Sequence, residues 1–153
     1  MTEPEIDLGE DPLALERQVC FALSIAARGV VAIYRPLLEP MGLTHPQYLV
    51  MLALWGRSPL TGKELCGLLA LDPGTLTPLL KRLEAAGYLR RDRHRDDERA
   101  LAVTLTDEGR ALREQALEIP PRVVSALGMP VSELESLHAA LTRVIAAARQ
   151  EQS

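Results

Sequence analysis

The sequence predicts a mainly α-helical fold of the α+β class, and three observations predict it. Hydrophobic residues make up 47% of the 153 residues but aromatic ones only 3%, so the core must be aliphatic, which suits packed helices. Apolar residues recur at steps of three and four over most of the chain, which is a helical period. Only residues 88–105 change to the pattern of two short strands, so one β-hairpin is expected among the helices.

A long first helix is expected over residues 12–40, after an acidic segment, residues 1–11, that we expect to be flexible. Two adjacent apolar stripes predict a wide buried face on this helix. The first stripe consists of Val19, Leu23, Ala26, Val30, Ile33 and Leu37. The start of the chain lacks the features of a signal peptide, and no apolar run approaches the roughly 20 residues of a membrane span. A cytoplasmic protein with no membrane partner is therefore expected.

Three shorter helices follow, and each begins at a residue whose side chain accepts a hydrogen bond from the first helical turn. These predicted starts are the capping boxes Thr44–Gln47 and Thr61–Glu64 and the pair Asp72–Pro73. The expected helices cover about 46–55, 62–69 and 73–86.

The hairpin and two last helices complete the predicted order. We expect strands at residues 88–92 and 100–105, with the charged linker 93–99 as a solvated tip. Thr106 then begins a helix that Pro120–Pro121 kinks or breaks. A last amphipathic helix is expected after the apparent capping box Ser132–Glu135.

The charge distribution points to nucleic acid although the formal net charge is −4. Residues 81–99 hold seven basic and five acidic side chains, a local charge of +2, against −6 for the remainder. A basic patch on an acidic protein is a more informative sign of nucleic-acid binding than the total charge.

Two short helices joined by a tight turn and followed by a basic hairpin predict a winged helix-turn-helix, over about residues 44–105, that binds double-stranded DNA. Residues 73–86 are then the recognition helix in the major groove, and the hairpin is a wing beside the minor groove. The expected DNA contacts are small or basic: Gly74, Thr75, Thr77, Lys81, Arg82, Arg93, Arg95 and Arg99. The alternative is an amphipathic helix and a charged hairpin that are merely solvated. The presence of all these elements in this order, with caps at the helix starts, favours DNA binding.

The motif LDPGTLTPLLKRLE at residues 71–84, followed by Gly87-Tyr88-Leu89 and by DDER at residues 96–99, resembles the MarR family of bacterial repressors. Residues 15–23, 34–38 and 43–48 resemble the organic hydroperoxide sensors within that family. The resemblance implies a homodimer on a pseudopalindromic operator, repressing a peroxide-detoxification gene. It implies one domain over 12–153, with dimerisation helices at about 12–40 and 106–150. It also implies that Asp97 orients Arg99 in the minor groove.

Cys20 is the predicted sensor, whose thiolate would attack an organic hydroperoxide and become a sulfenic acid. A free cysteine on an apolar stripe is more often a small core residue, so the resemblance carries this role. Family members hold the reactive thiol with tyrosine hydroxyls, and Tyr34 occupies one such position. Cys20 and Tyr34 are separated by roughly 21 Å along one continuous helix, at 1.5 Å per residue. The resemblance therefore implies that Tyr34 comes from the partner subunit.

His45 stands where these sensors have a second tyrosine, and two alternatives stay open for it. A neutral imidazole would hydrogen-bond the thiol and an imidazolium would lower the pKa of the thiol, whereas an exposed ring would do neither. Cys66 is expected in the core. Oxidised Cys20 would then be capped by a small thiol as a mixed disulfide. No cofactor or metal is expected.

Two other functions fit parts of the sequence. A MarR-type regulator could be released by an aromatic acid bound at the interface instead of by oxidation. A thiol peroxidase would also use a reactive cysteine, but the chain has no thioredoxin-like strand–helix pattern and no Cys-x-x-Cys motif. We therefore expect a regulator and not an enzyme.

Overall fold

The computed structural model describes residues 11–94 and 97–151, without the side chains of residues 12, 15–17, 93–94 and 97–100. The segment predicted to be flexible therefore lies outside the described residues, apart from Asp11. The mainly α-helical α+β class is confirmed. In chain order the elements are α1 (Pro12–Leu38), the 3₁₀ helix η1 (Glu39–Met41), α2 (His45–Gly56), β1 (Leu60–Thr61), α3 (Gly62–Leu69), α4 (Pro73–Ala85), β2 (Leu89–His94), β3 (Asp97–Leu105), α5 (Asp107–Ala116), α6 (Ile119–Leu127) and α7 (Val131–Glu151).

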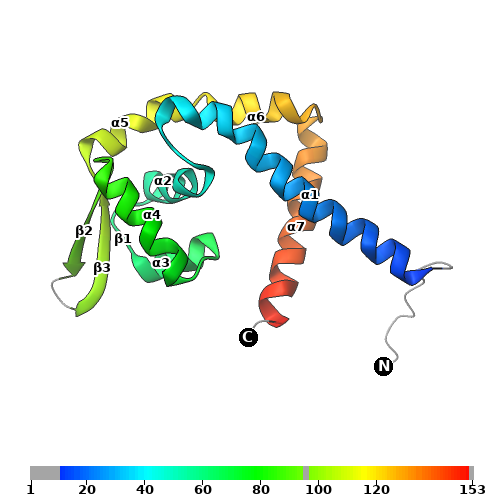
Figure 1. Cartoon of the computed structure of the whole chain (residues 1–153), viewed down its shortest axis with the longest axis horizontal. Helices are drawn as coiled ribbons and strands as arrows, with labels where there is room; N and C mark the ends of the chain where they lie inside the picture. Colours follow the sequence, from blue (N-terminus) through cyan, green and yellow to red (C-terminus); the bar gives the residue numbers. More distant parts are fainter. Residues whose placement is uncertain (1–10, 95–96, 152–153) are drawn as a thin grey trace.

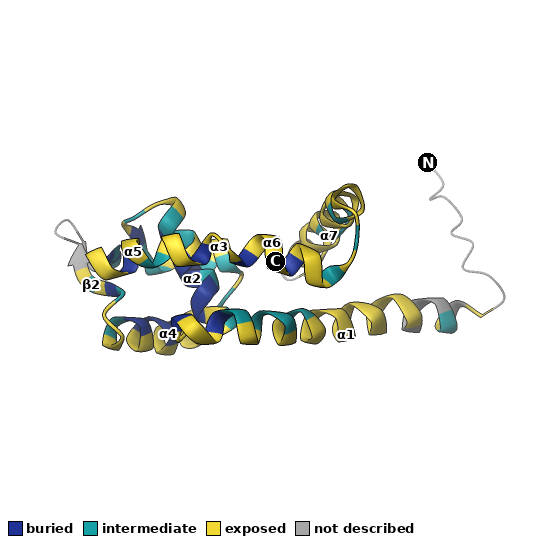
Figure 2. Ribbon diagram, turned by 90° about the horizontal axis from the view of Figure 1, so that it is seen from above, coloured by how far each residue is buried: buried dark blue, intermediate teal, exposed yellow. Residues whose placement is uncertain are grey.

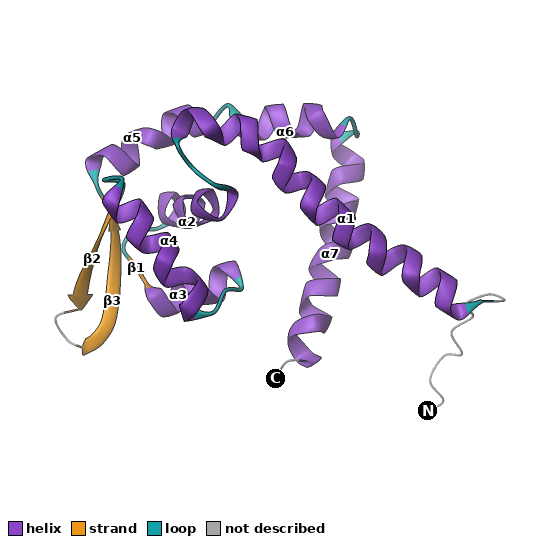
Figure 3. Ribbon diagram, viewed as in Figure 1, coloured by secondary structure: helices purple, strands orange, loops and turns teal. Residues whose placement is uncertain are grey.

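Two parts of the molecule can be distinguished in Figure 1. Residues 44–105, which we call the winged lobe, hold α2, α3, α4 and all three strands at one end (Figure 3). Helices α1, α6 and α7, which we call the outer helices, extend away from that lobe. Helix α5 joins the two parts above the lobe.

The hydrophobic core lies mainly in the winged lobe, as Figure 2 shows by its concentration of buried residues. Its fully buried large side chains are Leu38, Val50, Met51, Leu54, Leu60, Leu65, Leu83, Leu89 and Val103. Eight of these nine belong to the lobe, and the ninth is the last residue of α1. The lobe thus holds most of the core, which residues from the flanking elements complete: Leu38, Met41, Leu43, Ala116, Ile119 and Val123.

The predicted starts of the lobe helices are confirmed. Thr44 Oγ1 accepts a hydrogen bond from the Gln47 amide at 3.4 Å, and Gln47 Oε1 accepts one from the Thr44 amide at 2.9 Å. Thr61 and Asp72 accept from the third residues of their helices at 3.0 and 2.7 Å.

Two predicted helix boundaries were wrong. The expected box at Ser132 does not begin α7, because that helix already starts at Val131. The break expected at Pro120–Pro121 lies earlier, between the end of α5 at Ala116 and the start of α6 at Ile119. The two prolines lie in the first turn of α6, where a backbone N–H would have no partner within the helix.

The sheet is larger than predicted. Strand β1 was not expected, and it pairs antiparallel with β3 through Leu60 and Val103, giving the order β1-β3-β2. The linker 93–99, expected as a loop, instead continues both strands, with Arg93 opposite Leu101 and His94 opposite Asp97. A hairpin ladder is held by its backbone, so a run without apolar side chains can still extend it.

The outer helices leave large apolar side chains uncovered in the single chain. Phe21 is 64% exposed on α1, and Val144 and Ile145 are 50% and 51% exposed on α7. The segment Gln18–Met41 contains an 18-residue window with a mean hydropathy of 1.4, of which 6% is buried, so by length and composition it could cross a membrane. The sequence was expected to contain no apolar run as long as a membrane span, and that expectation was wrong. One such helix is weak evidence for a membrane, because the core helix of a soluble protein or a signal sequence passes the same test.

Candidate redox site and DNA-reading surface

Cys20 lies on the N-terminal half of α1, far from the winged lobe. Its side chain is exposed, and both Cys20 and Cys66 are free cysteines. A shallow hollow of about 440 Å³ surrounds it, lined by Gln18, Cys20, Phe21 and Ser24. One turn further on, the Ser24 hydroxyl donates to the Cys20 carbonyl at 3.2 Å. The thiol is thus accessible to a small oxidant in the single chain.

Tyr34 and His45 come together at the junction of α1 and α2, where the chain turns back through Gly42. Their ring centroids are 4.7 Å apart, and the Tyr48 ring lies 5.6 Å from that of Tyr34. Helix α1 is continuous from Pro12 to Leu38, so Cys20 remains roughly 21 Å from Tyr34 along the helix axis. The two halves of the predicted sensor are therefore apart within one chain.

Burial determines the protonation states of these rings. It raises the pKa of Tyr34 above 10.0, and it raises the pKa of Tyr48 with a further contribution from the charge of Tyr34. Burial also lowers the pKa of His45 below 6.5. At neutral pH both tyrosines are therefore O–H donors and the imidazole is neutral. The alternative of an exposed His45 is wrong, because its ring is half-buried and contacts Tyr34.

The sequence reasoning missed two members of this aromatic cluster, Tyr48 and Trp55. The Tyr48 and Trp55 centroids are 6.4 Å apart in an edge-on arrangement, and Trp55 Nε1 donates to the Gly109 carbonyl of α5 at 2.8 Å. Their spacing was a usable signal. Tyr48 follows His45 by three residues and Trp55 follows Tyr48 by seven, and these steps place all three on one face of a helix.

The predicted DNA-reading side chains of α4 lie on one open face. Gly74, Thr75, Thr77, Lys81 and Arg82 are all exposed. The opposite face packs into the core through Leu76, Leu79, Leu80 and Leu83. Helix α4 is therefore fixed to the lobe by its leucines and presents two threonines and two cations to the outside.

The first turn of α4 carries a carboxylate rather than a free anion site. The Asp72 side chain accepts a hydrogen bond from the Thr75 amide, and this bond is the main reason that its pKa is lowered. Gly74 leaves room for this cap, since a Cβ there would lie 3.3 Å from Asp72 Oδ1. Because this carboxylate is ionised and accepts the Thr75 N–H, the first turn offers a second anion less than an uncapped helix end would.

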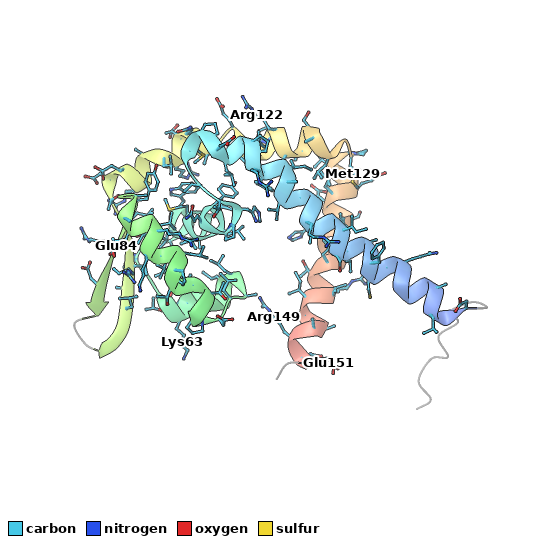
Figure 4. All side chains as sticks on the ribbon, viewed as in Figure 1. Lys63, Glu84, Arg122, Met129, Arg149 and Glu151 are labelled. Carbon is cyan, nitrogen blue, oxygen red and sulfur yellow. The ribbon has the colours of Figure 1, made fainter. Side chains whose placement is uncertain are left out.

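An ion pair joins the recognition helix to the wing. Arg91 Nη2 and Nε donate to Glu84 Oε1 at 2.9 and 3.3 Å, and the Arg91 amide donates to Glu84 Oε2 at 3.0 Å. Figure 4 labels Glu84 on α4 beside the strands. The Arg91 side chain hydrogen bond is the main cause of the lowered pKa of Glu84. This contact, also missed from sequence, fixes the base of the wing.

The tip of the wing falls outside the described side chains. Arg93, Asp97 and Arg99 belong to strands whose backbone is described, and Arg95 lies in the gap between them. The predicted roles of these four residues at the minor groove therefore stay predictions. Cys66 is half-buried and packs against the core, as expected.

A family model for the transcriptional regulators SarA/Rot matches residues 32–115. The HTH-type transcriptional regulator TtmR of Methylorubrum extorquens is 48% identical over 84% of this chain, and the match covers 66% of that longer relative. The organic hydroperoxide resistance transcriptional regulator of Bacillus subtilis is 38% identical over 92% of this chain and 96% of its own length. Both relatives are similar across most of the chain.

Solved structures share the fold. Reduced AbfR bound to DNA, a protein of Staphylococcus epidermidis, is 34% identical, with a TM-score of 0.78 over 90% of this chain and 96% of that chain. Wild-type MarR from Escherichia coli is 25% identical, with a TM-score of 0.67 over 80% of this chain and 93% of that chain. The first of these proteins is bound to DNA in the structure that matches.

Proposed function

The chain belongs to the MarR-like winged-helix family of transcriptional regulators, and on that premise we propose that it is a homodimeric repressor released from its operator when an organic hydroperoxide oxidises Cys20. Its relatives are named as regulators, so its class is a DNA-binding regulator and not a thiol peroxidase. The observation that carries the proposal is the split site: the exposed Cys20 thiol and the Tyr34 hydroxyl lie far apart on one unbroken helix, and His45 of α2 packs beside Tyr34.

A second copy of this chain would complete the split site. The outer helices carry uncovered apolar side chains, among them Val19, Phe21 and Ile25 on α1 and Ile145 on α7. Burial of such side chains stabilises association by about 25 cal/mol per Å² of apolar area. If two copies of α1 cross, Cys20 of one chain meets Tyr34 and His45 of the other. The dimer would then form both the sensor and the paired winged lobes that a pseudopalindromic operator needs.

The aromatic cluster suits a thiolate. Tyr34 keeps its proton because burial raises its pKa, so its hydroxyl donates a hydrogen bond to a negatively charged sulfur. The neutral His45 ring, whose pKa burial lowers, would donate through one ring nitrogen without adding a charge. Hydrogen bonds to the charged form favour that form, and the thiolate is the reactive species.

The oxidation then proceeds in two balanced steps. The Cys20 thiolate attacks one oxygen of the hydroperoxide, an S–O bond forms, the O–O bond breaks, and the alkoxide takes a proton and leaves as an alcohol. The sulfur is oxidised to a sulfenic acid and the peroxide is reduced. A low-molecular-weight thiol next attacks the sulfenic sulfur, an S–S bond forms, and the hydroxyl leaves as water. The mixed disulfide adds bulk at the site where the partner's aromatic cluster packs.

An operator gel shift on the reduced protein, with and without cumene hydroperoxide and a small thiol, tests the proposal. Wild type should release the duplex, while Cys20→Ser should bind it and ignore the oxidant. Cys66→Ser is the matched control and should respond as wild type does.

Release of Cys20→Ser by peroxide would refute the sensor assignment. Mass spectrometry of the treated wild type should find the adduct on Cys20. Release by an aromatic acid without any adduct would instead identify a ligand-gated regulator.

A further inference from the structure

The aromatic cluster continues beyond the predicted sensor pocket as a chain of contacts that ends on α5. The Tyr34 ring lies 5.6 Å from Tyr48, and the Tyr48 ring lies 6.4 Å from Trp55. Trp55 then donates its indole N–H to the Gly109 carbonyl at 2.8 Å, 54 residues further along the chain. These rings therefore connect the end of α1 with the start of α5 through the length of α2.

The start of α5 is in turn fixed to the junction between the recognition helix and the wing. A Cβ on Gly109 would lie 2.0 Å from the Tyr88 carbonyl oxygen, so α5 approaches Tyr88 as closely as only a glycine allows. The Thr106 amide donates to that same carbonyl at 3.1 Å. Tyr88 stands between the last residues of α4 and the first residue of β2. A displacement of Gly109 therefore acts directly on the junction that orients both DNA-reading elements.

Trp55 is only partly buried and has room to shift. It lines two hollows, of about 380 Å³ and 260 Å³, that both also involve Arg113 of α5. By contrast Met51, one turn earlier on α2, is fully buried and lines neither hollow. Close-packed side chains resist movement, whereas a side chain beside a hollow can change position without displacing others. The indole is the member of this chain of contacts best placed to move.

We propose that Trp55 is a positioning residue that transmits the state of the Tyr34–His45 pocket to the junction of recognition helix and wing. This inference deepens the proposed function, since it names the route from sensor to DNA-reading surface. The coupling runs in both directions, because linkage between two sites is reciprocal. The state of Tyr34 should consequently influence DNA affinity even in the reduced protein, and only while the Trp55–Gly109 hydrogen bond exists.

A double-mutant cycle on the reduced, full-length protein tests this without any oxidant. The variants are Tyr34→Ala, Trp55→Phe, which keeps an aromatic ring but loses the N–H donor, and the two combined. The probe is a duplex selected by reduced wild type from random-sequence DNA, and the readout is fluorescence anisotropy. Tyr34→Ala should weaken binding about tenfold while Trp55 is present and less than about twofold in the Trp55→Phe background, within the usual range of coupling between sites.

Tyr88→Phe is the matched control. It removes the hydrogen bond that the Tyr88 hydroxyl donates to the Met41 carbonyl at 3.4 Å, a second link between the end of α1 and the same junction. The effect of Tyr34→Ala should persist in that background. Equal effects of Tyr34→Ala in all three backgrounds, no effect in any, or a loss in the Tyr88→Phe background would each overturn the proposal. A purely structural role of Trp55 would lower thermal stability without changing how strongly Tyr34→Ala affects binding.

Trp55 is the only tryptophan of the chain, which supplies a second measurement with the indole intact. Tyr34→Ala should shift its emission, and adding the duplex should shift it in wild type. An emission unchanged by both would also refute the inference. None of these measurements uses peroxide. If Cys20→Ser still responded to peroxide, the proposed sensor would be refuted, but the coupling between Tyr34 and Trp55 measured here would remain valid.

Discussion

The winged lobe and the outer helices differ in how far one chain covers its own apolar surface. Leu65 and Val103 in the lobe are fully buried, whereas Phe21 on α1 is 64% exposed and no residue of α7 in the described part of the chain is buried. The lobe therefore buries most of its large apolar side chains within one chain, whereas under the proposed function α1 and α7 each form half of an interface. Under the proposed function the DNA-reading lobe is complete in one chain, and the sensor exists only between two.

The largest effect should come from a charge placed on the outer helices. Ile25→Asp combined with Val144→Asp puts two carboxylates among side chains that are 47% and 50% exposed in the single chain. We expect light scattering to show monomers and operator affinity to fall about 100-fold or more. Two lobes joined in one dimer bind a duplex that much more tightly than one lobe, because the second lobe binds within the same complex. Leu68→Asp, at a 62% exposed position on α3, is the control and should remain dimeric. A monomeric control, or a dimeric double variant, would contradict the comparison.

A cavity in the lobe should come next. Leu83 on α4 is 1% exposed, and Leu83→Ala should lower the free energy of unfolding by about 2–5 kcal/mol, measured by urea denaturation. Leu137→Ala on α7, at a position that is 44% exposed in the single chain, is the comparison. The free energy of unfolding that this variant loses should depend on protein concentration. A concentration-independent loss at Leu137 would mean that the outer helices are closed within one chain.

A smaller effect is expected at the ion pair between α4 and the wing. Glu84→Ala releases Arg91 from the ion pair. If the wing contacts DNA as predicted, operator binding should weaken about tenfold with little change in fold, because losing one such contact costs roughly that much. Glu84→Gln still accepts the hydrogen bond from the Arg91 amide and should weaken binding less. Anisotropy titrations at fixed salt measure both variants. Equal losses in the two would show that the charge alone matters.

The smallest effect should follow pH. The pKa of His45 is lowered in the folded chain, so the unfolded chain takes up a proton more readily as the pH falls below 6.5. The contribution of neutral His45 to stability is therefore present above pH 6.5 and is lost as the pH falls through the lowered pKa. Between about pH 7.5 and 5.5 the Tm of wild type should fall by up to about 3 °C more than that of His45→Gln. Identical pH slopes would contradict this.

Local signals in the sequence predicted most of the fold. Thr44, Thr61 and Asp72 begin their helices as expected because capping depends on residues within one turn. Strand β1 was missed because two residues show no period, and its existence depends on pairing with Val103, more than 40 residues away. The length of the wing was underestimated because its ladder continues through charged residues.

The candidate site was predicted in part. Cys20, Tyr34 and the exposed face of α4 follow from motifs, and their roles stay proposals. That Tyr34 meets His45 depends on the turn at residues 39–44, where Gly42 adopts a φ of +67° and returns the chain onto α1. The bond from Trp55 to Gly109 depends on the placement of α5 over α2, which no local pattern encodes. Contacts between distant elements were therefore the part that sequence reasoning lacked.

The unbroken α1 has a consequence for how such a dimer would respond to dose. Under the proposed function the thiol of one chain faces the rings of the other, so each lobe would respond to the redox state of its partner's cysteine and not to that of its own. A dimer oxidised at a single cysteine then has one intact lobe and one displaced lobe. If tight binding needs both lobes, the first oxidation event would be enough to release the DNA, and derepression would begin when only a minority of thiols has reacted.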